Sequence, residues 1–287
     1  MRFGLPYMGS KNTIAKKIID TLPAGDTFID VFAGGCAVTH AALLSGKYKH
    51  IICNDITDSP QLFYDAIHGK YKNETRWISR EDFFKQKDTD PYIRTCWSFG
   101  NNQKAYLYNQ NLEPYKKALH YARVFNDFSL FKEMNIDLSN LFSEQDASRL
   151  NLKRLADYIR RQYNAYIGLD RLQSLGRLDR LQSLQNLERL QSLERLGRLQ
   201  SLEISQCDYK QLTIPKDAIV YCDPPYENTA GYLQEFNGQE FYEWAKGKGY
   251  YISSYNAPFK IIASWDKTCT LSATNNSRVV KENLYLS

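Results

Sequence analysis

The hydrophobic pattern near the start of the chain predicts a strand, a helix and a second strand in succession. The apolar run 27–33, TFIDVFA, predicts a buried strand that ends at a glycine pair. Residues 36–46, CAVTHAALLSG, predict a helix, and residues 49–53, KHIIC, predict the next strand. This order of elements is typical of an α/β fold with parallel strands.

A second α/β segment begins at the apolar run 218–222, AIVYC. Pro224 and Pro225 follow it, and because proline donates no ladder hydrogen bond they are expected beyond the carboxyl end of the strand. Open α/β sheets bind ligands at that edge. The segment continues with a predicted helix near 238–249 and strands at 250–255 and 281–287.

A leucine repeat separates these segments. Leucine occupies every third position from Leu169 to Leu202, within a nine-residue repeat that covers 169–204. Successive leucines would be displaced by about 60° around an α-helix, so a single straight amphipathic helix is a poor match. Short helical pieces broken near Gly176 and Gly197, or a small solenoid, are both open. The repeat contains no residue set of catalytic type, so we interpret it as a spacer or packing insert.

Composition narrows the class of protein. The chain has 287 residues, 43% of them hydrophobic, which is enough for one large domain or for one domain that carries an insertion. Its net charge of +5 permits a nucleic-acid partner without requiring one. The six Cys and four His show no metal-ligand spacing, so we expect no metal site. With neither a signal-like start nor an apolar run of about 20 residues, no membrane association and a cytoplasmic location are expected.

The first glycine turn is followed by an acid at an informative distance. Gly34 and Gly35 permit close approach of the backbone to a ligand, and Asp55 lies 21 residues after Gly34, just beyond the second strand. A carboxylate at that place can bind ribose hydroxyls, which indicates a nucleoside-containing cofactor. The glycine spacing does not match the dinucleotide fingerprint. A plain turn with Asp55 as a helix N-cap is the alternative.

The tetrapeptide DPPY, residues 223–226, presents hydrogen-bond acceptors beside an aromatic ring. The Asp223 carboxylate and the Pro224 carbonyl can each accept a hydrogen bond from one amino group, and Tyr226 offers a face for stacking. This combination is suited to an exocyclic amine on a planar heterocycle. A surface turn with an aspartate cap is the alternative.

Several motifs, in this order, resemble those of the Dam-like DNA adenine methyltransferases. They are PYMGSK, DVFAGG, CNDIT, DPPY, YYISSYN and SRVVKENLYL. The resemblance implies an α/β, Rossmann-like methyltransferase sheet that binds S-adenosyl-L-methionine (AdoMet), with a mainly helical target-recognition insertion. The catalytic domain would comprise residues 1–58 and 205–287, and the insertion residues 59–204.

The resemblance also implies a reaction and a set of site residues. A methyl group would pass from AdoMet to the exocyclic N6 amino group of an adenine flipped out of double-stranded DNA at a specific site. Asp223 and the Pro224 carbonyl would hold the amine, and Tyr226 would stack on the base, so Tyr226→Phe should be tolerated. The implied cofactor-binding residues are Tyr7, Lys11, Asp30, Gly34, Asp55 and Asp223.

Three features depart from the family pattern. Tyr7 stands where the family often has Trp, and Cys36 stands where a second glycine of the turn is usual. The leucine repeat replaces the usual recognition segment. No base-reading residue is therefore assigned from the resemblance.

Candidate DNA contacts come from the residue types alone. The segment 94–111 combines aromatic rings with amide and basic side chains, although aromatic residues there could equally form core and the Gly-Asn-Asn a turn. Arg154, Arg160, Arg161 and the loop 273–278 are further candidates, with a solvated face as the alternative for the arginines. The residues selected as DNA-binding are Asn101, Asn102, Lys104 and Arg278.

Other functions are weighed against this one. An RNA adenine or a cytosine amino-methyltransferase would use the same chemistry, but the cytosine enzymes more often resemble SPPY. A non-catalytic DNA-binding module would be expected to have lost at least one of the site residues. All four are present here: Asp55, Asp223, Pro224 and Tyr226. A monomer is expected, and a cognate restriction endonuclease is a candidate partner.

Overall fold

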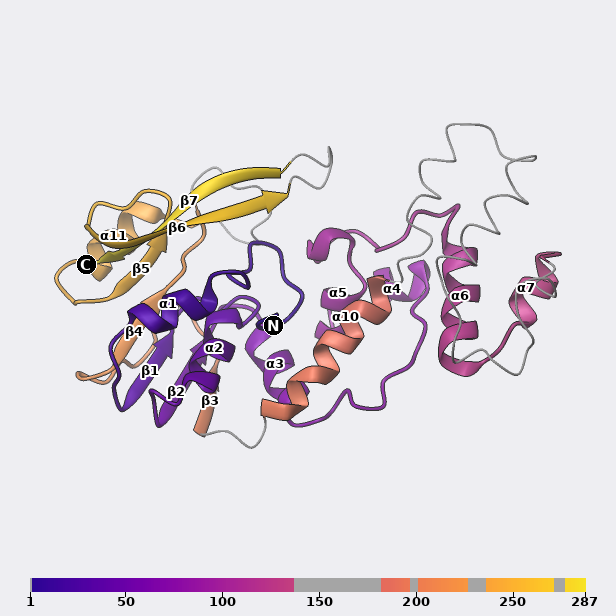
Figure 1. Cartoon of the computed structure of the whole chain (residues 1–287), viewed down its shortest axis with the longest axis horizontal. Coiled ribbons are helices and arrows are strands. Elements are labelled where there is room, and N and C mark those ends of the chain that lie inside the picture. Colours follow the sequence, from indigo (N-terminus) through magenta and orange to yellow (C-terminus); the bar gives the residue numbers. More distant parts are fainter. Residues whose placement is uncertain (1, 137–181, 197–200, 227–235, 271–276) are drawn as a thin grey trace. The chain divides into compact units, whose positions relative to one another are not determined.

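The computed structural model describes residues 2–136, 182–196, 201–226, 236–270 and 277–287 (Figure 1). It comprises two compact units. The first unit contains Met1–Lys72, Gly100–Asn102 and Arg189–Ser287, and the second contains Asn73–Phe99 and Gln103–Glu188. These boundaries differ from the expected ones at 58 and 205, because helix α3 (Ser59–Ile67) and strand β3 (Ser201–Ser205) pack together in the first unit.

The first unit is built on a seven-stranded sheet in the order β3-β2-β1-β4-β5-β7-β6. Strands β1 to β5 are parallel neighbours, whereas β7 runs antiparallel to both β5 and β6. This sheet confirms the predicted α/β, Rossmann-like fold. Besides β3, its strands are β1 (Thr27–Asp30), β2 (His50–Asn54), β4 (Ile219–Cys222), β5 (Tyr251–Ser254), β6 (Lys260–Thr270) and β7 (Ser277–Leu286).

The core of the first unit lies where the sheet meets helix α11 (Gly238–Ala245). Ile29, Val220, Ile252 and Phe241 are buried against one another there. Strands β1 and β4 pair at the centre of the sheet. Their apolar side chains are suited to this place because α11 covers them. Helices α1 (Ala15–Thr21) and α2 (Ala37–Ser45) pack on each other, with α2 between β1 and β2 in the chain.

Most elements predicted from apolar runs are present with small differences at their ends. Within the α/β part, helix α1 and strands β3 and β6 are present although the hydrophobic pattern did not indicate them. Strand β6, KIIASWDKTCT, pairs only with β7 at the edge of the sheet, and Ile261 and Ile262 on it are exposed. An edge strand has no need of the continuous apolar run by which a central strand is recognised.

The described part of the leucine repeat consists of three short elements. Helix α10 (Gln182–Gln191) passes into a 3₁₀ helix, η3 (Ser192–Leu196), and the chain then enters β3. Leu187, Leu190, Leu193 and Leu196 are all buried. A 3₁₀ helix has three residues per turn, so a leucine at every third position stays on one face there. A helical piece therefore ends beside Gly197, as the first of the two expectations had it, while Gly176 lies outside the described residues.

Hydrogen bonds join the points where the chain leaves the first unit and returns to it. The Gln191 side-chain amide donates to the carbonyls of Tyr71 at 3.1 Å and Lys72 at 2.9 Å. Lys72 Nζ also lies 3.0 Å from Glu194 Oε1. The point where the chain first leaves the first unit and the point where it finally returns are thus fixed next to each other by residues of that unit.

An aromatic cluster forms the core of the second unit. The Trp77 ring stacks on Tyr108 at 5.7 Å and meets Trp97 edge to face at 5.1 Å. Trp97, Tyr106 and Tyr108 are buried, so these three rings of segment 94–111 are core, as the alternative reading had it, whereas Phe99 is exposed. The helices of this unit are α4 (Arg80–Gln86), α5 (Pro91–Cys96), α6 (Glu113–Phe125), α7 (Ser129–Glu133) and the start of α10.

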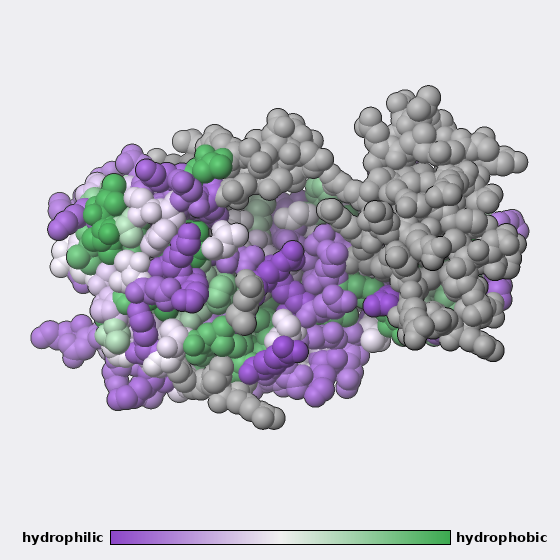
Figure 2. Space-filling view, in the orientation of Figure 1, coloured by the Kyte–Doolittle hydropathy of each residue, from purple (hydrophilic) through white to green (hydrophobic). Residues whose placement is uncertain are grey.

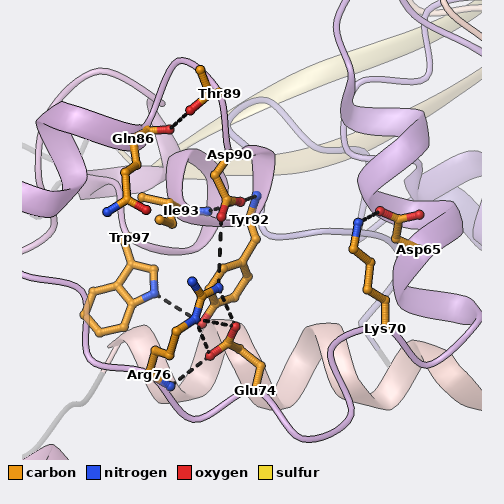
Figure 3. A network of polar contacts seen from close by, with 10 residues as sticks. All are labelled: Asp65, Lys70, Glu74, Arg76, Gln86, Thr89, Asp90, Tyr92, Ile93 and Trp97. Carbon is orange, nitrogen blue, oxygen red and sulfur yellow. Dashed lines mark hydrogen bonds and ion pairs between the residues drawn. The ribbon is translucent and has the colours of Figure 1, made fainter.

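Polar contacts order the chain beside this aromatic core (Figure 3). Arg76 Nη2 lies 2.6 Å from Glu74 Oε2, and the Arg76 guanidinium lies over the Tyr92 ring. The Asp90 carboxylate accepts hydrogen bonds from the amides of Tyr92 at 2.9 Å and Ile93 at 3.2 Å, and so caps α5. These contacts explain why the helix begins directly after Asp90.

None of the helices that the structure describes is long and apolar enough to span a lipid bilayer. Figure 2 shows hydrophilic side chains over much of the visible described surface, with apolar side chains in separate smaller areas.

Candidate active site

Three carboxylates follow three neighbouring strands of the sheet. Asp30 is the last residue of β1, Asp55 follows β2 and Asp223 follows β4. Because β1 pairs in parallel with both β2 and β4, these strands end at one edge. The chain order reverses between β1 and β4, and a reversal of this kind marks the ligand-binding edge of an α/β sheet. The structure therefore brings together the three acids selected from the sequence.

The glycine turn after β1 is packed against Tyr7. A Cβ atom added at Gly35 would lie 2.4 Å from Tyr7 Cβ, and one at Gly34 would lie 3.2 Å from Tyr7 Cε1. Gly34 also takes a positive φ of 47°. No side chain can be added at Gly35 without displacing Tyr7, which explains the two glycines.

Cys36 adopts the conformation that the family's usual glycine would favour. Its φ of 55° and ψ of 33° are left-handed, and it precedes the first residue of α2. A left-handed conformation costs a non-glycine residue roughly 1–2 kcal/mol. The replacement of glycine by Cys36 therefore does not change the left-handed backbone conformation at this position of the turn.

Asp55 holds the same turn from the neighbouring strand. Its Oδ2 accepts a hydrogen bond from the Gly34 amide at 2.8 Å, and its Oδ1 accepts from the amide and hydroxyl of Thr57 at 2.9 Å and 2.8 Å. Asp55 does not stand at the N-cap of a helix, as the alternative proposed, because the residue that precedes α3 is Asp58. A carboxylate has about four acceptor positions, so Asp55 retains capacity for hydroxyl donors.

Asp30 is buried with one oxygen unsatisfied. Its Oδ2 accepts hydrogen bonds from the Thr39 amide at 3.1 Å and hydroxyl at 2.7 Å. Its Oδ1 is buried and accepts no hydrogen bond from the described residues. Burial raises the pKa of Asp30 to about 7, against the opposing effect of the Thr39 hydroxyl and with a further rise from Asp223. A buried acceptor of this kind is suited to a donor from a ligand.

Lys11 pairs with the aspartate of the DPPY motif. Its Nζ lies 2.6 Å from Asp223 Oδ1, and its side chain is 4% exposed. Lys11 is thus directed at Asp223, in addition to any role toward a cofactor that the resemblance implies. Pro224, the next residue, is buried.

The Tyr226 hydroxyl is engaged by two carboxylates. It donates to Asp223 Oδ1 at 3.0 Å and to Glu282 Oε1. Lys11 Nζ lies 4.7 Å from the centre of the Tyr226 ring, and Tyr255 meets that ring edge to face. Burial, Asp223 and Glu282 together raise the pKa of Tyr226 well above its usual range, so the hydroxyl stays protonated. The DPPY motif predicts a role for the ring face alone, whereas the hydroxyl contacts involve Glu282, which lies outside the motif.

Glu282 and Lys267 were not selected from the sequence. The Glu282 side chain is fully buried on β7, and its Oε1 lies 3.6 Å from Lys11 Nζ. Lys267, on β6, lies 3.8 Å from Glu282 Oε2. The available signal was a charged residue two positions before the apolar end of the closing strand, but such a residue is also common on exposed strands.

The DNA-binding candidates near residue 100 lie on a closed loop of the backbone. Ser98 and Tyr106 form an antiparallel bridge, and the Phe99 amide donates to the Ala105 carbonyl at 2.8 Å. Asn101 and Asn102 group with the first unit, and Lys104 is exposed in the second. The side chain of Arg278 lies outside the described residues, as do Arg154, Arg160, Arg161 and 273–276.

A family model described as D12 class N6 adenine-specific DNA methyltransferase matches residues 7–269. The chain belongs to this family. No curated protein matches the sequence.

Family membership confirms the resemblance read from the motifs and the assignment of an enzyme. This D12 methyltransferase methylates adenine N6 in DNA, which sets aside the cytosine, RNA and non-catalytic alternatives. The match begins at Tyr7 and spans the glycine turn and DPPY, so the residues that surround Asp223 lie within it, except Glu282.

The described residues of this D12 methyltransferase contain no His, Cys, Asp and Glu grouping that could hold a metal ion. The charged groups around Asp223 are instead two lysines and a second carboxylate.

Proposed function

We propose that the chain takes its methyl group from AdoMet and that Asp223, Pro224 and Tyr226 hold the target adenine. One observation carries this proposal. Both hydrogen bonds to the Asp223 carboxylate, from Lys11 and Tyr226, engage Oδ1, and no described residue donates to Oδ2. Oδ2 is therefore the oxygen we assign to the amino group of the base, at the ligand-binding edge of the sheet.

The residues present are suited to AdoMet. The unsatisfied Oδ1 of Asp30 supports a contact with the ammonium group of the methionine end. Tyr7 and the tight Gly34–Gly35 turn support close approach of the backbone, and Asp55 supports a ribose contact. Lys11 contributes to the site through Asp223.

AdoMet, when bound, supplies an electrophilic methyl group. The amine of adenine is a weak nucleophile because its lone pair is delocalised into the ring. Asp223 Oδ2 and the Pro224 carbonyl would each accept a hydrogen bond from one N–H of the amine. These two hydrogen bonds direct the nitrogen lone pair toward the methyl donor. N6 must lose one proton in the reaction, and we assign Asp223 Oδ2 as its acceptor.

We further propose that the second unit, together with the loop near residue 100, reads a specific site in double-stranded DNA and that the target adenine is flipped out of the duplex. Flipping costs a few kcal/mol, which stacking and hydrogen bonds to the flipped base can offset. Asn101 and Asn102 are suited to base edges and Lys104 to phosphate. All residues of the proposed site come from one chain, which supports action as a monomer.

Mass spectrometry of nucleosides tests this function. Unmethylated duplex DNA is incubated with AdoMet and either the wild type, Asp223→Asn or a matched control, Asp217→Asn, at an exposed position. We expect N6-methyladenine from the wild type and the control, and a rate at least about 10- to 100-fold lower from Asp223→Asn, because a hydrogen bond to a charged group is lost. Equal rates from all three would remove Asp223 from the site.

A further inference from the structure

Glu282 is a buried carboxylate that the reaction described above does not use. It lies on β7, which pairs with β5 next to the strand that carries DPPY. Its side chain is 0% exposed. A buried ionised carboxylate is costly unless it is paired and hydrogen-bonded, so its neighbours indicate why it is present.

Two lysines and a tyrosine surround this carboxylate. Oε1 accepts from the Tyr226 hydroxyl and lies 3.6 Å from Lys11 Nζ, while Oε2 lies 3.8 Å from Lys267 Nζ. With Asp223, the group contains two carboxylates and two ammonium groups, so its charges balance. The balance offsets part of the cost of burying Glu282, whose Oε2 accepts no hydrogen bond from the described residues.

The Tyr226 hydroxyl has one proton and two acceptors. It cannot donate fully to both Asp223 and Glu282 at once. Without Glu282, the Tyr226 hydroxyl would donate its hydrogen bond to Asp223 alone. That carboxylate would then be a weaker acceptor for the amino group of the base. Glu282 thus keeps the hydroxyl, and with it the Tyr226 ring, at a fixed angle.

Lys267 extends the group to the N-terminal motif. Its Nζ donates to the Gly9 carbonyl at 3.4 Å, between Tyr7 and Lys11 in the chain. Glu282 therefore contacts, directly or through Lys267, three segments that are far apart in the sequence: the loop at 7–11, DPPY and the hairpin of β6 and β7.

We propose that Glu282 is a positioning residue for methyl transfer, acting through the Tyr226 hydroxyl and the Lys11 ammonium to set the Asp223 carboxylate for the amino group. The inference rests on the proposed function of Asp223. It assigns Glu282 no contact with AdoMet or DNA.

Glu282→Gln is the first test, because it keeps the volume and removes the charge. Single-turnover methylation with saturating AdoMet and DNA should slow by roughly 10- to 100-fold, the effect of one hydrogen bond to a charged group. The KM for DNA should change by less than about threefold, since the rate-limiting geometry and not uniform binding is altered. The matched control is Glu203→Gln, at an exposed position of β3 in the same sheet.

A double-mutant cycle separates positioning from general structural damage. Tyr226→Phe removes one of the two groups through which Glu282 acts, so Glu282→Gln should have a clearly smaller effect in that background than in the wild type. Independent effects that multiply would overturn the proposal, as would a wild-type rate in Glu282→Gln. If Glu282→Gln fails to fold, the cycle is run with Glu282→Gln combined with Lys267→Met, which removes one charge of each sign.

The two proposals fail in different ways. Absence of methylation by the wild type with AdoMet contradicts the proposed donor and with it this inference. Methylation that depends on Asp223 but not on Glu282 contradicts the inference alone.

Discussion

Lys11 and Asp223 are 212 residues apart in the sequence, and Lys11 Nζ lies 2.6 Å from Asp223 Oδ1. The pair joins the N-terminal motif to the motif after β4. The second oxygen of Asp223 accepts no hydrogen bond from the residues that the structure describes.

Lys11→Met should therefore reduce both activity and stability. It leaves the buried Glu282 with Lys267 as its remaining cation among the described contacts, and removing one partner of a buried ion pair costs on the order of 3–5 kcal/mol. We expect a lower midpoint in urea denaturation and a methylation rate at least about 100-fold lower. Lys16→Met, at an exposed position of α1, is the control and should match the wild type. An unchanged midpoint in Lys11→Met would contradict the proposed charge balance.

Asp30 should make stability fall as the pH rises. Its pKa is about 7 in the folded protein and 3.8 in the unfolded chain, so the folded state binds the proton more tightly. The contribution is complete below pH 3.8 and is lost as the pH rises through about 7, by about 1.4 kcal/mol per unit between these values.

Urea denaturation at several pH values between 5 and 8 measures this slope. Asp30→Asn should lack the part of the slope that Asp30 contributes, whereas Asp20→Asn, at an exposed position, should retain it. Equal slopes in the wild type and Asp30→Asn would show that Asp30 is ionised throughout.

Gly35→Ala should disrupt the turn and weaken AdoMet binding. The new Cβ would lie 2.4 Å from Tyr7 Cβ, a distance that requires backbone or Tyr7 to move. Isothermal titration should give an AdoMet affinity at least about 10-fold lower, equivalent to about 1.4 kcal/mol. Gly46→Ala is the control: it adds a Cβ with no neighbour within 4 Å, at a position after α2 rather than in the turn, and should leave the affinity unchanged. Similar affinities for the Gly35→Ala variant and the wild type would exclude the turn from the cofactor site.

Leu190→Ala should destabilise the protein by about 2–5 kcal/mol, because Leu190 is fully buried in α10. Leu184→Ala, at a partly exposed position of the same repeat, should cost less. Thermal unfolding of both variants distinguishes a packing insert from a spacer. Equal and small shifts would mean that the leucines act only as a spacer.

The sequence predicted the strands that are central and apolar, and it predicted which acids follow them. Asp55 and Asp223 could be found because each lies just beyond an apolar run, and parallel strands bring their ends together, whereas Asp30, inside the run 27–33, was assigned from the family resemblance. Edge strands β3 and β6 could not be found in this way, because pairing on one side leaves their composition mixed.

The contacts of Tyr226 depend on tertiary structure and could not be read from DPPY. Glu282 reaches the hydroxyl because β7 inserts antiparallel between β5 and β6. Nothing in local sequence fixes that order. The structure accordingly changes the expectation for Tyr226→Phe, from a tolerated substitution to one that leaves a buried carboxylate without its donor.

The hydrogen bonds from Gln191 to Tyr71 and Lys72 have a consequence for how such a chain can diversify. They bring the exit and return of the inserted segment to one place on the first unit, so its sheet does not depend on the length of what is inserted there. Any replacement module whose own ends lie close together could be accommodated at this junction, and a new target word could be acquired by exchange of a single contiguous stretch of gene.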